Sequence, residues 1–126
     1  MEHMAVFDTN ILIDLFNNRV EAADAIDHAA SHRAISLITW MEVMVGAKKY
    51  HQEQRTRMAL STFNIINISQ DIAERSVALR QEYKLKLPDA IILATAQLHR
   101  LELITRNTKD FAGIPGVATP YEIHPE

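Results

Sequence analysis

Residues 4–17 read MAVFDTNILIDLFN. The first four are apolar and suit a short buried strand. Apolar residues then return at helical spacing, which predicts a helix over residues 10–17: Ile11, Leu12, Leu15 and Phe16. Asp8 lies at the boundary between the two. A strand that passes directly into a helix is the repeating unit of open α/β proteins, so this stretch decides the fold class.

The same alternation continues along the chain. Further strands are predicted at residues 34–38, 64–68 and 101–105, with a short fifth strand at 117–118. The predicted helices are residues 20–30, the amphipathic stripe Trp40, Val43, Met44 and Ala47, residues 52–63, and the segment capped by Ser69. A last helix has Pro88 in its first turn and is apolar over residues 90–98. We therefore predict an α/β protein, an α/β/α sandwich with a short, mostly parallel central sheet of four to five strands.

The composition fits a single domain over residues 1–126. Of these residues 48% are hydrophobic and 23% charged, which suits one compact core and argues against disorder. The chain has no cysteine, which excludes disulfides, zinc ribbons and thiol nucleophiles and fits a reducing cytoplasm. The formal charge of −3 gives no overall attraction to polyanions, so a nucleic-acid substrate would need a local basic patch and metal ions.

No targeting or membrane segment is predicted. The apolar run at Val6 and Phe7 is too short for a signal peptide, and Asp8 interrupts it. The longest apolar stretch, residues 90–96, falls well below membrane-spanning length. We expect a cytoplasmic protein without a membrane partner. Met1 and Met4 are both candidate start residues.

Four acidic residues lie where a strand or loop should pass into a helix: Asp8, Glu42, Asp89 and Asp110. Loops at the carboxyl edge of an open α/β sheet converge in space, so we expect these side chains to meet. Carboxylates held together repel one another unless a divalent cation neutralises them, and hard oxygen ligands suit Mg²⁺ or Mn²⁺. The pattern predicts a metal site.

Each acid also has a purely local explanation. Asp8 can cap the following helix, and Asp89 sits in a first helical turn, where the macrodipole favours a negative charge. Thr39 and Glu42 have the spacing of a capping box, although Glu42 points away from the apolar stripe, toward the side of Gly46. Asp110 belongs to a polar loop. The ordered set of four, rather than any single member, indicates a shared site.

The ordered motifs resemble the PIN-domain family, and within it the VapC-type toxins of bacterial toxin–antitoxin pairs. The motifs are VFDTN at residues 6–10, Glu42 with Gly46, Pro88-Asp89-Ala90, and TRNTKDF at residues 105–111. The resemblance covers essentially the whole chain. It implies a PIN-like fold and a metal-dependent endoribonuclease that forms a homodimer. It also implies a cognate VapB-type antitoxin, which blocks the acidic pocket from a groove near the early helices.

The resemblance implies Asp8, Glu42 and Asp89 as the first three catalytic acids. Asn107 and Asp110 both lie in the loop that carries the fourth; we choose Asp110 as the acid and Asn107 as a polar or water-mediated ligand. Our hypothesis has Asp8 and Asp89 binding the principal Mg²⁺ or Mn²⁺, with Glu42 and Asp110 orienting its water shell. Thr9 and Asn10 are supporting residues that hold Asp8 or contact phosphate.

Basic side chains near these motifs are candidate contacts for the RNA backbone. Arg106 and Lys109 rank first because their loop carries Asp110, and Lys48 and Lys49 form a second group. Solvated helix faces are the alternative reading of the same charges.

Two other functions compete with the nuclease. A haloacid-dehalogenase-like phosphatase also starts with an Asp after its first strand, but it needs a second Asp two residues later, where this chain has Asn10. A metal-binding or RNA-binding module without catalysis is the other alternative.

Overall fold

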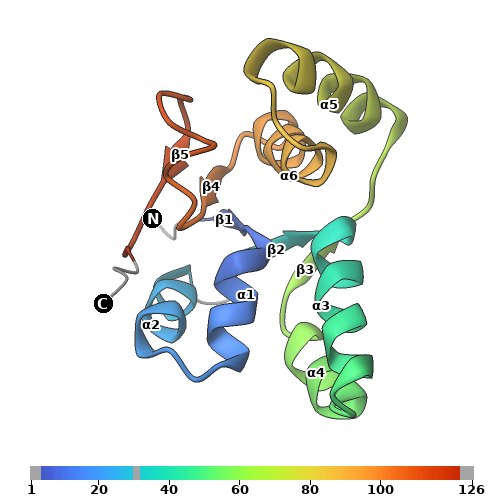
Figure 1. Ribbon diagram of the computed structural model, residues 1–126, viewed down its shortest axis with the longest axis vertical. Coiled ribbons are helices and arrows are strands. Elements are labelled where there is room, and N and C mark those ends of the chain that lie inside the picture. Colours follow the sequence, from blue (N-terminus) through green and yellow to red (C-terminus); the bar gives the residue numbers. More distant parts are fainter. Residues whose placement is uncertain (1–3, 30–31, 123–126) are drawn as a thin grey trace.

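The centre of the molecule is a sheet of five strands in which every neighbouring pair is parallel (Figure 1). The computed structural model describes residues 4–29 and 32–122; the candidate start Met1 and the predicted helix end Ala30 lie outside them. The strands are β1 (Ala5–Phe7), β2 (Arg33–Ser36), β3 (Asn64–Ile66), β4 (Glu102–Ile104) and β5 (Val117–Ala118). The predicted α/β class is confirmed, and the sheet has all five expected strands.

The strand order is β3-β2-β1-β4-β5, with β1 in the middle. The order in which the chain adds strands reverses at β1, although all the strands run parallel. The chain moves outward from β1 to β2 and β3, then returns to the other side of β1 with β4. Open α/β sheets bind ligands where the order reverses, beyond the carboxyl ends of the strands. That point lies between β1 and β4, whose last paired residues are Phe7 and Ile104. Asp8 and Thr105, which follow them, are therefore neighbours.

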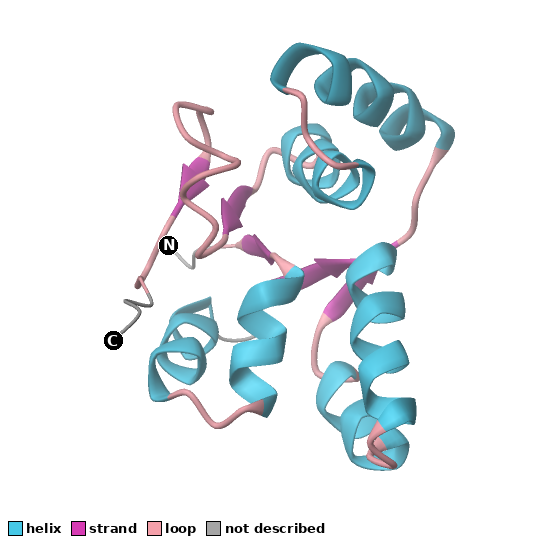
Figure 2. Cartoon of the chain, viewed as in Figure 1, coloured by secondary structure: helices cyan, strands magenta, loops and turns pink. Residues whose placement is uncertain are grey.

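The described residues form helices on both faces of the sheet (Figure 2). On one face lie α1 (Thr9–Phe16), α2 (Val20–Ala29), α3 (Leu37–Lys49) and α4 (Glu53–Leu60), and on the other α5 (Gln70–Tyr83) and α6 (Leu87–Leu98). None of the helices in the described part of the chain has the length and apolar character to cross a membrane.

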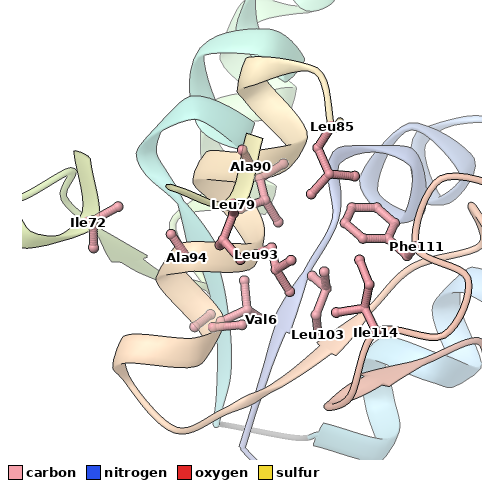
Figure 3. Packing of buried hydrophobic residues seen from close by; sticks show 13 residues of the cluster. Val6, Ile72, Leu79, Leu85, Ala90, Leu93, Ala94, Leu103, Phe111 and Ile114 are labelled. Carbon is pink, nitrogen blue, oxygen red and sulfur yellow. The ribbon is translucent and has the colours of Figure 1, made fainter. Parts of the chain in front are cut away.

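The two faces have separate cores, because side chains along β1 alternate between them. Val6 packs with Leu79 of α5 and Leu93 of α6 (Figure 3). Ala5 and Phe7 belong to the cluster under the other helices, which includes Ile11 and Leu60. The predicted three-layer sandwich is thereby confirmed.

The start of α3 differs from the sequence prediction. The strand expected to reach Ile38 ends at Ser36, and the Ser36 hydroxyl accepts a hydrogen bond from the Ile38 N–H as the helix N-cap. Thr39 is therefore already inside the helix. The capping box suggested for Thr39 and Glu42 is wrong, because Ser36 takes the capping position three residues earlier.

The other boundaries shift by a few residues. The helix predicted over residues 10–17 is α1 (Thr9–Phe16), and that over residues 52–63 is shortened to α4 (Glu53–Leu60). The final helix begins at Leu87, which places Pro88 and Asp89 in its first turn as expected.

Candidate functional site

Asp8 directly follows β1 and caps α1. Its side chain is buried, with 3% of the residue exposed, and it accepts three hydrogen bonds from neutral donors. The Thr9 N–H lies 2.7 Å from Oδ1, the Thr105 hydroxyl 2.7 Å from Oδ2, and the Asn10 amide nitrogen 3.3 Å from Oδ2. The carboxylate is thus held in one orientation without a positively charged partner in these bonds.

Electrostatic effects connect the four predicted acids. The pKa of Asp8 is raised from 3.8 to about 6, chiefly by burial and also by Asp89 and Glu42, while the hydrogen bonds from Thr105 and Thr9 oppose the change. The pKa of Asp89 is also raised, first by burial and then by Asp110 and Glu42, with Lys86 acting against them. Glu42 acts on both Asp8 and Asp89, so these carboxylates belong to one electrostatic cluster.

Glu42 lies in the second turn of α3 and reaches α1 through Thr9. The Thr9 hydroxyl is 2.7 Å from Glu42 Oε1 and 3.0 Å from the Thr39 hydroxyl. A threonine has only one hydroxyl proton, so donation to the carboxylate leaves Thr39 as donor to Thr9. Thr9 therefore orients Glu42, and its backbone N–H holds Asp8.

Asp89 is half-buried in the first turn of α6, at the positive end of the helix dipole. Its helix packs on the opposite face of the sheet from α1 and α3 (Figure 1). The site is therefore assembled from both layers of helices.

Asn107 and Asp110 form a reciprocal pair. The Asn107 amide nitrogen donates to Asp110 Oδ2 at 2.9 Å, and the Asp110 N–H donates to Asn107 Oδ1 at 3.1 Å. The Asn107 N–H also bonds to the Thr105 hydroxyl at 3.0 Å. Both residues thus belong to one hydrogen-bonded loop that continues to Asp8 through Thr105.

Within residues 4–29 and 32–122, no three His, Asp or Glu side chains are arranged to hold one metal ion directly. Mg²⁺ usually takes only one or two carboxylates and keeps several waters, so it does not require such a group. Oxygen donors with raised pKa values suit a hard divalent cation, because a cation would relieve their repulsion. The residues present therefore fit this type of ion.

The sequence prediction missed Thr105 as a site residue. It is fully buried, donates to Asp8 and accepts hydrogen bonds from Asn10 and Asn107. The available signal was its position directly after a predicted strand, but its closeness to Asp8 depends on the pairing of β4 with β1.

The predicted RNA contacts have different surroundings. The Arg106 guanidinium is bound to the buried Asp14, with Nε 2.6 Å from Oδ2 and Nη2 3.2 Å from Oδ1, so it is held within the fold. Lys109 is exposed on the same loop, and Lys48 and Lys49 are exposed at the end of α3. Lys49 Nζ also lies 5.6 Å from the centre of the Tyr50 ring.

A groove of about 390 Å³ begins beside Glu42. It runs between α1 and the helices α3 and α4, and its lining is mostly apolar: Ile13, Phe16, Asn17, Glu42, Val43, Gly46, Ala47, Tyr50, Gln52 and Thr56. A Cβ atom at Gly46 would meet nothing within 4 Å, which leaves open space beside Glu42.

The fold and the site together define a class: an open α/β protein with an acidic cluster where its strand order reverses. The chain belongs to the PIN-domain family, because the family model described as "PIN domain" matches residues 5–117. The comparison with curated proteins found no match.

Solved structures share the fold. A toxin–antitoxin complex from Klebsiella pneumoniae contains a chain 87% identical to this one, with a TM-score of 0.92 and coverage of 94% of this chain and 99% of that chain. DNA-bound VapBC from Salmonella typhimurium is 22% identical, with a TM-score of 0.78 and coverage of 94% and 99%. FitAcB from Neisseria gonorrhoeae is 23% identical, with a TM-score of 0.80 and coverage of 95% and 100%.

Proposed function

We propose that this protein is a metal-dependent endoribonuclease and the toxin of a type II toxin–antitoxin pair. The observation that carries the proposal is the cluster of Asp8, Glu42, Asp89 and Asp110, in which the acids raise the pKa values of Asp8 and Asp89. The chain that is 87% identical comes from a toxin–antitoxin complex, which supports the biological role.

Asp8 and Asp89 are the proposed direct ligands of Mg²⁺ or Mn²⁺, and Glu42 and Asp110 would orient its water shell. When bound, the ion would neutralise charge on the scissile phosphate and lower the pKa of a bound water. The protein's own contribution is position: Thr105 and Asn10 fix Asp8, and Thr9 fixes Glu42. Hydrolysis by water leaves 5′-phosphate and 3′-hydroxyl ends on the RNA.

The RNA backbone would contact the exposed cations near the acidic edge. Lys109 is the strongest candidate because it shares the loop of Asp110, and Lys48 and Lys49 extend the basic surface along α3. Arg106 acts through its contact with Asp14 instead.

The groove beside Glu42 is the proposed docking site of a VapB-type antitoxin. Its apolar lining suits an amphipathic segment, and a basic side chain at the end of that segment would reach Glu42. A homodimer is also proposed, using apolar residues exposed on α3 and α5, such as Val45 and Val77. Substrate and partner would both be cytoplasmic.

The decisive experiment incubates the purified protein with RNA and Mn²⁺, with and without chelator. The variant Asp8→Asn removes the central acid, and Asp24→Asn, an exposed acid on α2, is the matched control. Chelator-sensitive cleavage that is lost only in Asp8→Asn supports the proposal. Ends bearing 2′,3′-cyclic phosphate would contradict it. Phosphate release from small phosphomonoesters would favour the phosphatase, and RNA binding without cleavage the non-catalytic module.

A further inference from the structure

Asp14 is a buried carboxylate outside the predicted acidic set. It lies on α1 with 3% of the residue exposed, and its oxygens bind two groups from distant parts of the chain. Arg106 donates to both oxygens, and the Tyr121 hydroxyl donates to Oδ2 at 2.8 Å. Arg19 approaches only to 3.9 Å and is more exposed. Asp14 therefore acts as an anchor for Arg106 and Tyr121.

Arg106 stands between two residues of the acidic site. Thr105 before it donates to Asp8, and Asn107 after it pairs with Asp110. The Arg106 N–H also lies 3.4 Å from Asn10 Oδ1. Asn10 and Asp14 are four residues apart, so they lie on the same face of α1. The helix thus holds the loop of residues 105–110 at two successive turns.

The geometry of the Arg106 contact is well suited to fixing a loop. A guanidinium that donates from two nitrogens to both oxygens of a carboxylate has a defined orientation, unlike a single ammonium contact. Burial of Asp14 protects this contact from solvent screening.

We infer that Asp14 and Arg106 are positioning residues for the acidic site: their two-point contact sets where Thr105, Asn107 and Asp110 stand relative to Asp8. In this role the two side chains act through the loop, without contact with the substrate or the ion. The functional consequence rests on the function proposed above, whereas the positioning itself is a property of the metal-free protein.

The first measurement is hydrogen exchange of the Asn107 and Asp110 amides in metal-free protein, because both amides donate to side chains inside the loop. Asp14→Asn removes the charge, and Arg106→Lys keeps a charge but loses the two-nitrogen contact. We expect both amides to exchange at least about tenfold faster in each variant, at a temperature where every variant is fully folded. Arg19→Ala, and Ile72→Val in the opposite core, should exchange like wild type.

The second measurement is Mn²⁺ affinity by calorimetry, followed by steady-state cleavage of a fluorescent RNA. Loss of residues that orient ligands typically costs 10–100-fold in metal affinity. We expect a loss of about tenfold in Asp14→Asn and Arg106→Lys, with a lower kcat and little change in KM.

Unchanged amide exchange in both variants would overturn the inference, and so would wild-type Mn²⁺ affinity in both, provided that the wild-type protein binds Mn²⁺. Faster exchange in a protein whose wild type does not bind Mn²⁺ would support the positioning role and would reject the proposed function instead. The two failures are therefore distinguishable.

Discussion

Thr105 is 97 residues away from Asp8 in the sequence, yet its hydroxyl donates a 2.7 Å hydrogen bond to the Asp8 carboxylate. The contact exists because β1 and β4 are neighbours and both end one residue earlier. It joins the central acid to the loop of Asn107 and Asp110. Thr105 is thus the link between the two halves of the acidic site.

Replacement of this hydroxyl by a methyl group, in Thr105→Val, should raise the pKa of Asp8 above its value of about 6, because a hydrogen bond that favours the ionised form is lost. The substitution also leaves the hydrogen-bonding partners of Thr105 without that hydroxyl, which should lower the free energy of unfolding by about 1–3 kcal/mol. Carboxyl carbon NMR titration and urea unfolding measure the two effects. Thr105→Ser keeps the hydroxyl, and a shift of equal size in that variant would contradict the explanation.

Asp8→Asn should have a strongly pH-dependent effect on the stability of metal-free protein. The pKa of Asp8 is raised from 3.8 to about 6, chiefly by burial. Between these values the folded chain holds a proton that the unfolded chain has released, so stability falls as the pH rises and the penalty is complete above about 6. Its size is about 3 kcal/mol.

Asparagine at position 8 cannot ionise, so this variant should escape the penalty. The free energy of unfolding of Asp8→Asn minus that of wild type should therefore be larger at pH 7 than at pH 4 by about 2–2.5 kcal/mol, because a small part of the penalty is already present at pH 4. Urea unfolding in chelator at both pH values checks this difference. The exposed control Asp24→Asn should show a difference near zero. A difference near zero in Asp8→Asn would show that the ionised Asp8 carboxylate does not destabilise the fold.

Divalent metal should stabilise the wild-type protein at neutral pH. An ion present at 100 times its dissociation constant adds about 2.7 kcal/mol, which corresponds to a rise of several degrees in Tm. Thermal unfolding with Mn²⁺ and then with chelator measures this rise. The increase should disappear in Asp8→Asn and persist in Asp24→Asn; an equal increase in both variants would place the ion elsewhere.

Gly46→Ala should stabilise the fold by about 0.5–1 kcal/mol, because glycine is unfavourable inside a helix and the added Cβ meets nothing within 4 Å. Gly46→Leu should fold equally well but fill the groove beside Glu42. Unfolding experiments test the first effect. Affinity for the co-purified antitoxin tests the second, and unchanged affinity would exclude this part of the groove as the docking site.

Ser36→Ala should cost about 1 kcal/mol, because it removes the N-cap of α3. Thr39→Ala tests the rejected capping box. The stability lost in Thr39→Ala should come from its contact with Thr9, so the loss should be smaller when Thr9 is already valine. The stability lost in Ser36→Ala should be the same with Thr9 or Val at position 9. Double-mutant cycles by urea unfolding measure both quantities.

The sequence predicted the elements well because its apolar spacing is local information. Residues 4–17 contain both the strand pattern and the helix pattern, and the observed boundary lies within one residue of the expected one. The four acids could be chosen for a related reason: each follows a change in local pattern, and parallel strands bring such positions to one edge.

One wrong prediction and one missed contact both depend on pairings that sequence spacing does not contain. Ser36 and Thr39 are both good N-cap residues, and the choice depends on how far β2 pairs with β3, which ends at Ser36 opposite Ile66. The ion pair of Arg106 with Asp14 was not predicted, because the two residues are 92 positions apart. In both cases the sheet pairing decided which partner each side chain found.

The central position of β1 has a consequence for the order of events during synthesis. The N-terminal segment supplies Asp8, but the residues that fix and complete its surroundings, Thr105 to Asp110, follow more than ninety residues later. A growing chain that has not yet inserted β4 beside β1 cannot assemble the acidic edge. The chemistry of this edge is therefore absent from unfinished chains, and it becomes possible only after β4 has paired with β1.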